Sequence, residues 1–414
     1  MTEPDMALAA ALFADLGAAT RQGRGIVRDS YGDGEQAAHD LMRSAAAAMG
    51  LEISIDAIGN LTMTLPGSQR DAPGILIGSH LDSVPQGGNF DGAAGVVAGL
   101  SALSGLRRAG VVPRVDLKVM AIRGEESSWF DISYIGSGGA FGLLDPDCLA
   151  IARSDNGCSF ESALLARGFD PGAIRERRRL LDPGRIRAYL ELHIEQGPTL
   201  VEMGLPAAVV SAIRGCRRFR NARCFGQYGH SGTLSREHRR DAVAATVALL
   251  HHLESVWIQY EGRGADLVFT AGELSTDPAL HAPSKVSGET RFVLDFRSAS
   301  EATMRDIVAE AREAAVRIGD EYRVRFELGD TSDSPAAAMD PRLRAALMGV
   351  FDQPFEMASG AGHDAAVFAQ VGIPSAMIFV RNDNGSHNAE ESMDLEDLAV
   401  ATRSLIRLLV DFPF

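Results

Sequence analysis

The sequence predicts an α/β protein: a mixed, mostly parallel sheet covered by helices on both faces, with a smaller α+β domain inserted into it. Three features of the 414-residue chain carry this prediction. Strand-like and helix-like segments alternate over residues 35–122, a different order of elements occupies residues 221–328, and the alternation resumes over residues 341–380. A chain of this length also exceeds one ordinary hydrophobic core, which favours two domains.

The first part of the chain predicts the main sheet and its helices. An amphipathic helix, a second helix, a hairpin turning at Gly59 and Asn60, a buried strand, a helix and another strand are expected in that order. Their residues are 1–23, 35–49, 51–65, 74–80, 92–110 and 115–122. Strands that alternate with helices pair in parallel, and the chemistry of such sheets collects at the carboxyl ends of the strands.

The inserted domain is predicted from a strand–helix–strand–strand–helix–strand order, which is typical of a ferredoxin-like fold. Its elements are expected at residues 221–229, 240–260, 265–274, 288–298, 301–319 and 322–328. The polar run GDTSDSPAAAMD that follows predicts a linker. We therefore expect one domain at 1–209 and 329–414, and the inserted domain at 210–328.

Composition and charge exclude several classes of protein. The net charge is −15, from 40 basic and 55 acidic residues, so the chain repels phosphate backbones and nucleic acid is not an expected partner. No apolar run approaches the ~18 residues of a membrane span. The four cysteines form no CxxC pair, which argues against a sulfur-ligated zinc site. So few cysteines in a chain of this length fit a reducing compartment, and the N-terminus carries acids where a signal peptide carries basic residues. We expect a cytoplasmic protein.

Four clusters of histidine and carboxylate residues follow apolar strands. They are GSHLDSVPQGGNFDGAAGV (78–96), RGEESSWF (123–130), ELHIEQGP (191–198) and NGSHNAEE (384–391). Histidine and carboxylate are the ligands expected for zinc, manganese, cobalt or nickel. The occurrence of all four clusters in one chain predicts a metal-dependent active site.

The chemistry of individual residues supports this prediction. Asp82 lies two residues after His80, so along a strand end it can accept the other ring N–H of this candidate ligand. Asp91 opens a glycine-rich helix start, where backbone N–H groups stabilise its charge, and its two oxygens can bridge two metals. Glu125 and Glu126 point in different directions, so one can bind metal while the other takes the proton of an attacking water.

Each cluster taken alone also has an ordinary structural interpretation. A pair of adjacent glutamates is usually a solvated surface pair. His193 could be a core histidine satisfied by backbone groups. The combination of the clusters, and no single one of them, favours catalysis.

The strings GSHLDSVPQGGNFDGAAGV, LELHIEQGP, GHSG, LDFRS, SGAGHDA and GSHN carry a resemblance that runs from residue 35 to the C-terminus. They resemble the two-metal aminoacylase/carboxypeptidase-type metallohydrolases. Within these they are similar to the amidase branch of N-carbamoyl-L-amino-acid hydrolases, β-ureidopropionases and allantoate amidohydrolases. ELHIEQGP is the most specific string, because it places His193 where peptidase relatives carry an acidic ligand.

This resemblance implies a site for two divalent cations, Zn²⁺ or Mn²⁺, Co²⁺ or Ni²⁺. The implied ligands are His80 and His193 for one metal, Glu126 and His387 for the other, and Asp91 as the bridge. Glu125 would be the general base, and Asp82 would hold His80.

The resemblance also implies residues that contact the substrate. Arg297 would grip a carboxylate with its planar fork, and His230 would polarise the scissile carbonyl from the other subunit of a homodimer formed through the inserted domain. Gln196 would hydrogen-bond the ureido or carboxylate end. Ser284 stands where relatives have an asparagine, and His363 lies in a glycine-rich loop that could approach a bound carboxylate. Without the resemblance, Arg297 fits a surface salt bridge and His230 a turn histidine.

Together these features predict an amidohydrolase whose inserted domain acts as a lid. The substrate would be a small N-carbamoyl-amino-acid-like carboxylate: an N-carbamoyl-L-amino acid, a β-ureido acid or allantoate. An N-acyl-amino-acid deacylase or dipeptidase on the same scaffold is the alternative. A metal-free binding protein that kept the fold is the remote alternative.

Overall fold

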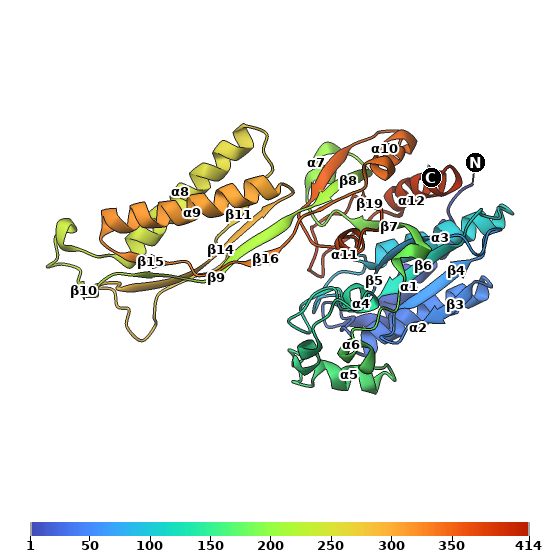
Figure 1. Ribbon diagram of the computed structural model, residues 1–414, viewed down its shortest axis with the longest axis horizontal. Helices are drawn as coiled ribbons and strands as arrows, with labels where there is room; N and C mark the ends of the chain where they lie inside the picture. The colour runs from blue at the N-terminus through green and yellow to red at the C-terminus, as the bar shows by residue number, and fades with distance from the viewer. Residues whose placement is uncertain (1, 413–414) are drawn as a thin grey trace. The chain divides into compact units, whose positions relative to one another are not determined.

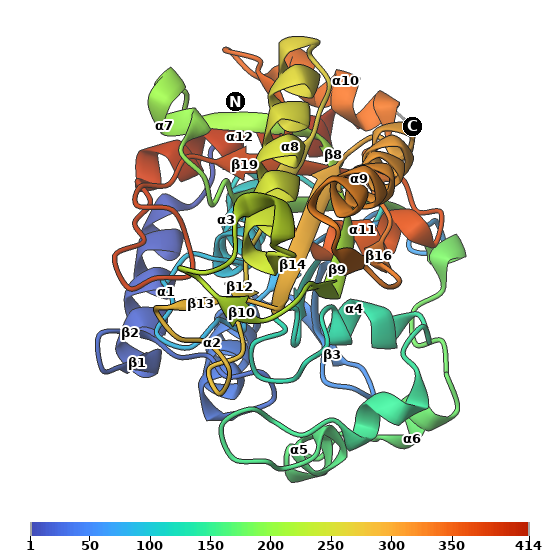
Figure 2. The same ribbon diagram turned by 90° about the vertical axis from the view of Figure 1, so that its left-hand side faces the viewer.

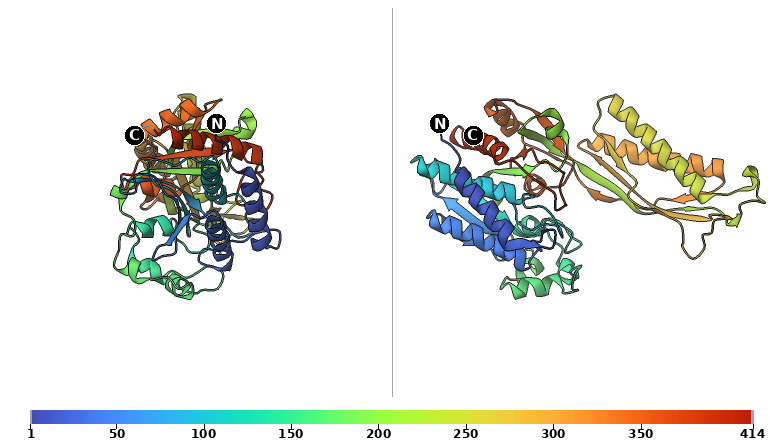
Figure 3. Two further views of the ribbon diagram at one scale, coloured as in Figure 1. Left: turned by 90° about the vertical axis from the view of Figure 1, so that its right-hand side faces the viewer. Right: turned by 180° about the vertical axis from the view of Figure 1, so that it is seen from behind.

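The computed structural model describes residues 2–412, which form two compact units. The first unit is built from the two ends of the chain, up to Ser211 and from Ala338 onward, and the inserted unit is Ala212–Ala337. The first and last helices of the chain contact each other within the first unit (Figure 3). Among residues 2–412, no helix combines the length and apolarity needed to cross a bilayer.

The first unit is organised around a mixed sheet with the strand order β17-β8-β19-β7-β5-β6-β4-β3, in which β18 also pairs with β8 (Figure 1). The strands are β3 (Glu52–Ile55), β4 (Leu61–Leu65), β5 (Gly74–His80), β6 (Leu117–Ile122), β7 (Ile186–Ile194), β8 (Ala207–Ile213), β17 (Ala337–Ala338), β18 (Glu356–Ser359) and β19 (Ser375–Val380). A separate small ribbon joins β1 (Arg21–Gln22) to β2 (Gly25–Ile26).

The central strands β6, β5, β7 and β19 pair in parallel. The flanking pairs β3–β4, β4–β6 and β8–β19 are antiparallel. The prediction of a mixed sheet is confirmed, but "mostly parallel" describes only its centre. The hairpin at Gly59 and Asn60 reverses the chain, so β4 must run against β3.

Helices cover this sheet, and its central strands are buried along almost their whole length. The helices are α1 (Met6–Thr20), α2 (Asp33–Ala48), α3 (Ala93–Arg108), α4 (Ile135–Ala140), α5 (Phe160–Ala166), α6 (Gly172–Arg175), α7 (Thr199–Met203), α10 (Pro341–Val350), α11 (Asp364–Gln370) and α12 (Leu395–Val410). The helix α3 packs on β5, β6 and β7 and is itself covered by α1 and α12, which explains why its sequence is apolar on nearly every side.

The inserted unit is an antiparallel sheet with the order β11-β14-β9-β15, and two long helices cover one of its faces (Figures 1 and 2). Its main elements are β9 (Gly215–Phe225), α8 (Ala242–Gly262), β11 (Val268–Thr270), β14 (Glu289–Ser298), α9 (Glu301–Tyr322) and β15 (Arg325–Glu327). Residues alternate along β14: Phe292, Leu294 and Phe296 join the core under the helices, while Asp295 and Arg297 lie on the opposite face. Three further short strands of the unit are β10 (Gly229–His230), β12 (Leu274–Ser275) and β13 (Lys285–Val286).

The segment predicted to be a linker is partly a strand. Within it, β16 (Ser332–Ser334) pairs with β9, so the inserted unit extends to Ala337 and not only to residue 328. The strand β9 also begins at Gly215, earlier than the predicted residue 221. Both segments are rich in polar or charged residues because many of their side chains are exposed. Their composition therefore did not indicate strands.

Candidate active site

Three buried side chains from separate segments converge at the carboxyl edge of the main sheet. His80 ends β5, His193 lies near the end of β7, and Asp91 immediately precedes Gly92 and the start of α3. Asp91 Oδ1 lies 3.2 Å from His193 Nε2 and 3.6 Å from His80 Nε2. Because their donor atoms lie within 4.8 Å of one another, these residues have the spacing and chemistry of a divalent-metal site.

A second group of donors shares Asp91. Asp91 Oδ2 lies 3.4 Å from His387 Nε2, which is in turn 3.2 Å from Glu126 Oε1. Each oxygen of Asp91 therefore faces a different donor group. This is the arrangement expected of a carboxylate that bridges two cations.

The hydrogen bonding of Asp91 also fits bound metal. Oδ1 is buried and makes no hydrogen bond within residues 2–412, although an unsatisfied buried acceptor is costly. A cation between Oδ1 and the two imidazoles would satisfy this oxygen. The donor set is all histidine and carboxylate, which suits zinc and other first-row divalent metals.

Asp82 lies behind the candidate ligands and hydrogen-bonds to the residues that carry them. It is fully buried, and its Oδ1 lies 3.2 Å from His80 Nδ1, which leaves His80 Nε2 to face the metal position. Oδ1 also accepts the backbone N–H of Glu125 at 3.1 Å, while Oδ2 accepts that of Glu126 at 3.1 Å and the hydroxyl of Ser30 at 2.6 Å. One carboxylate thus holds a candidate ligand and the turn that carries both glutamates.

Glu125 lies beside the donor groups, with Oε2 3.9 Å from His80 Nε2. Burial raises the pKa of Glu125 well above its usual range, and the negative charge of Glu126 raises it further, while His80 opposes the shift. A carboxyl group with a raised pKa can take a proton and return it near neutral pH.

His387 differs from the other donors in being half exposed and in the left-handed backbone region, with φ +60°. Hydrogen bonds with Asp91 and Glu126 raise the pKa of His387 to about 10. A protonated imidazole cannot bind metal, so metal binding at this position must displace a proton.

Two further predicted residues lie in the first unit. Gln196 donates from Nε2 to Asp91 Oδ2 at 2.9 Å, so it contacts the bridging carboxylate directly. His363 is only 1% exposed; it packs against His193 and its Nε2 lies 2.9 Å from Ser359 Oγ. His363 therefore has almost no surface for a substrate, and the structure favours a supporting role behind His193.

The remaining predicted residues lie in the inserted unit. His230 is exposed on β10, opposite Lys285 of β13, and the neighbouring Ser231 N–H donates to the Ser284 carbonyl at 2.9 Å. His230 and Ser284 are therefore neighbours. Arg297 lies near the C-terminal end of β14, where its Nε donates to Asp295 Oδ1 at 3.1 Å.

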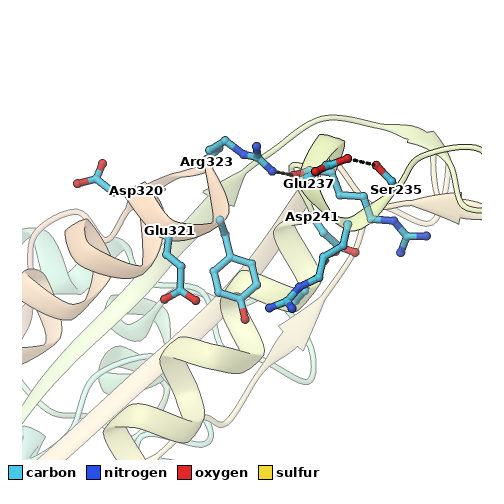
Figure 4. A pocket seen from close by; sticks show the side chains of 10 residues that line it. Ser235, Glu237, Asp241, Asp320, Glu321 and Arg323 are labelled. Carbon is cyan, nitrogen blue, oxygen red and sulfur yellow. Dashed lines mark hydrogen bonds between the residues drawn. The ribbon is translucent and has the colours of Figure 1, made fainter.

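A cavity of about 1140 Å³ also lies in the inserted unit, between the loop after His230 and the end of α9 (Figure 4). None of the predicted site residues lines it. Arg239 donates to the carbonyls of Ser231 and Leu234, and Arg323 donates to that of Arg239. These arginines brace the loop that follows His230, and we assign the cavity no ligand.

Sequence reasoning missed the residues that hold the ligands in place. Ser30, Ser386 and Glu391 make buried or partly buried hydrogen bonds to Asp82, Asp91 or their backbone. Ser386 and Glu391 stand inside the fourth cluster, so their position beside His387 was the one available signal.

Comparisons with known proteins agree with this geometry. The model of peptidase family M20/M25/M40 matches residues 76–411. The chain is 35% identical over 391 residues to an N-carbamoyl-L-amino acid amidohydrolase of Geobacillus stearothermophilus, covering 92% of each chain. It is 35% identical over 369 residues to an allantoate amidohydrolase of Escherichia coli, covering 88% of this chain and 87% of the relative.

Comparison with solved structures leads to the same family. The crystal structure of a hydantoinase/carbamoylase family amidase from Burkholderia ambifaria superposes with a TM-score of 0.87 at 29% identity, covering 99% of this chain and 98% of that one. The resemblance predicted from the motifs is confirmed. The chain belongs to peptidase family M20/M25/M40, and the relatives named here are amidases and amidohydrolases of that family.

Proposed function

We propose that this protein is a metal-dependent amidohydrolase that cleaves a linear C–N bond in a small N-carbamoyl or ureido carboxylate. N-carbamoyl-L-amino acids, β-ureido acids and allantoate are the candidate substrates. The observation that carries the proposal is the pair of donor groups that share Asp91 beside the buried carboxyl of Glu125. The names of two relatives, N-carbamoyl-L-amino acid amidohydrolase and allantoate amidohydrolase, support the substrate class.

The donor groups would hold two divalent cations, Zn²⁺ or Mn²⁺, Co²⁺ or Ni²⁺. His80 and His193 would bind one, Glu126 and His387 the other, and Asp91 both. When bound, such cations lower the pKa of a water molecule and stabilise an oxyanion.

Glu125 would move the proton. It takes a proton from the attacking water, whose oxygen bonds to the carbamoyl carbon, and returns the proton to the leaving nitrogen as the C–N bond breaks. For an N-carbamoyl amino acid and one water, the products are carbon dioxide, ammonia and the free amino acid. Asp82 keeps Glu125 in place through its backbone N–H.

The separation of His230 and Ser284 from Arg297 within the inserted unit supports a homodimer. His230 and Ser284 lie next to the start of β14, whereas Arg297 lies eight residues along it from Glu289. Eight residues of strand span about 26 Å, longer than a small amino-acid derivative. We therefore propose that Arg297 grips the substrate carboxylate, while His230 and Ser284 reach the same substrate from a partner subunit.

The inserted unit would then serve as both lid and dimerisation domain. Its βαββαβ order supports a ferredoxin-like fold, and closure of such a domain would exclude water from the reaction. Val243, Val247 and Ile258 expose apolar surface along α8, which suits contact with a second copy. We further propose a cytoplasmic location, because all four cysteines are free in the structure.

Two matched substitutions test the role of Glu125. Glu125→Gln should keep both metals and lower ammonia release from N-carbamoyl-L-alanine by at least about 100-fold. Glu126→Gln should lose one metal. A fully active Glu125→Gln variant would refute the assignment of the base.

The alternative activities are separated by substrate and metal content. We expect the metal-loaded protein to release ammonia from N-carbamoyl-L-alanine or allantoate faster than acetate from N-acetyl-L-alanine. Faster release of acetate would favour the deacylase. Failure of the purified protein to bind any of the four metals would favour the metal-free binding protein.

A further inference from the structure

The loop that carries His387 is fastened to the turn that carries Asp91 by a buried carboxylate, Glu391. This side chain is only 6% exposed. Its Oε1 accepts the backbone N–H groups of Phe90 at 2.9 Å and Asp91 at 3.1 Å. Its Oε2 lies 2.6 Å from the hydroxyl of Ser386. These bonds run to the two segments that carry Asp91 and His387 of the second donor group.

Ser386 extends the link to the side chain of Asp91. Its hydroxyl lies 2.6 Å from Asp91 Oδ2, the same oxygen that faces His387. The next residue in the chain is His387 itself. The Ser386 hydroxyl therefore lies between two carboxylates and can donate its one proton to either of them. The path from Glu391 through Ser386 ends on the candidate bridging ligand.

The surrounding structure is built around this link. Arg28, fully buried, approaches the same turn and donates to Asn89 Oδ1 at 3.1 Å and to the Asp91 carbonyl at 3.5 Å. A Cβ at Gly88 would collide with the Glu391 carboxyl group. Arg28 and Glu391 therefore both hydrogen-bond to the turn that carries Asp91. The absence of a side chain at Gly88 leaves room for the Glu391 carboxylate to reach this turn.

We propose that Glu391 is a positioning residue for the metal held by Glu126 and His387. By tying the His387 loop to the backbone and side chain of Asp91, it sets the distance between these two ligands. The proposal rests on the metal site of the proposed function, but not on the identity of the substrate.

The test compares Glu391→Ala with a matched control, Glu390→Ala. Glu390 is the preceding residue, its side chain is 63% exposed, and it pairs with Arg24. Metal content is measured at graded free Mn²⁺ or Zn²⁺ on the full chain. We expect Glu391→Ala to weaken the second of two metal-binding steps by about 10–100-fold and to leave the first unchanged. Glu390→Ala should bind both metals normally.

A conservative variant separates positioning from charge. In Glu391→Gln the amide oxygen can still accept the two backbone N–H groups and the NH₂ group can donate to Ser386, so most of the lost affinity should return. If Glu391→Ala does not fold, Ser386→Ala removes the link to Asp91 and should show the same selective loss. Unchanged affinity for both metals, or an equal loss at both, overturns the proposal.

The outcome is independent of turnover. A wild-type protein that binds two metals but hydrolyses no carbamoyl or ureido compound would refute the proposed function, while the effect of Glu391→Ala on the second metal would still decide the positioning role.

Discussion

Replacing Asp82 with asparagine would test how strongly the ligands depend on the layer beneath them. Both carboxylate oxygens accept hydrogen bonds from donors, on one side from Glu125 N–H and His80, on the other from Glu126 N–H and Ser30. An asparagine can offer an oxygen to only one side. Its NH₂ group must face the donors on the other side.

The less costly orientation turns the NH₂ group toward Ser30, because that hydroxyl can rotate to accept. The N–H of Glu126 then loses its partner in a buried position. One lost hydrogen bond to a charged group and one unsatisfied N–H correspond to about 2–4 kcal/mol of the free energy of unfolding. In this orientation His80 keeps an oxygen acceptor, but from a neutral amide in place of a carboxylate. Weakening such a partner of a metal-binding histidine typically lowers metal affinity about 10–100-fold.

Two assays measure these effects. Urea unfolding of the metal-free protein gives the change in stability, and a competition titration with a chelating dye gives the metal affinity. The matched control is Asp15→Asn, an exposed aspartate on α1, for which we expect a change within about 0.5 kcal/mol. Wild-type metal affinity in folded Asp82→Asn would refute the reasoning.

Other substitutions and conditions probe separate parts of the molecule. Gly92 has φ +63°, and a Cβ there would meet the His80 ring, so Gly92→Ala should lose metal binding; normal metal content in this variant would contradict the geometry. The pKa of His387 is raised to about 10, so below that pH metal must displace its proton. Metal affinity should therefore rise with pH up to about 10, with measurable proton release; a pH-independent affinity would contradict this. Leu253→Ala in the core of the inserted unit should lower the free energy of unfolding by about 2–5 kcal/mol without changing metal content; an altered metal content would show that the two cores are not independent.

The candidate ligands could be predicted because their signals are local. Each cluster follows a continuous apolar run, and in a sheet with parallel central strands the carboxyl ends of those strands meet at one edge. His80 and His193 then come together as a consequence of topology alone. The hairpin and the long helices were predictable for the same reason, since their periodicity lies within one segment.

What could not be predicted depends on contacts between distant segments or on misleading local chemistry. Glu391 hydrogen-bonds to the backbone of Asp91, which lies 300 residues away in the sequence. No local sequence periodicity indicates that contact. The strand β16 (Ser332–Ser334) is all polar and pairs at an exposed position, so its composition indicated a loop. His363 stands in a glycine-rich loop that suggested access to substrate, but the packing of His193 and Phe379 encloses it.

The density of buried acids explains why the chain would need cations here. Asp91, Glu125 and Glu391 are buried within one site, and burial raises the pKa of both Glu125 and Glu391. Buried like charges cost several kcal/mol unless they are protonated or neutralised by positive charge. Arg28 supplies one positive charge, but its hydrogen bonds go to the backbone and side chain of the Asp91 turn. A divalent cation would supply the rest and would lower the pKa of Glu125 toward the range in which it is ionised. Metal loading and readiness of the base are therefore linked, because the same charge stabilises both.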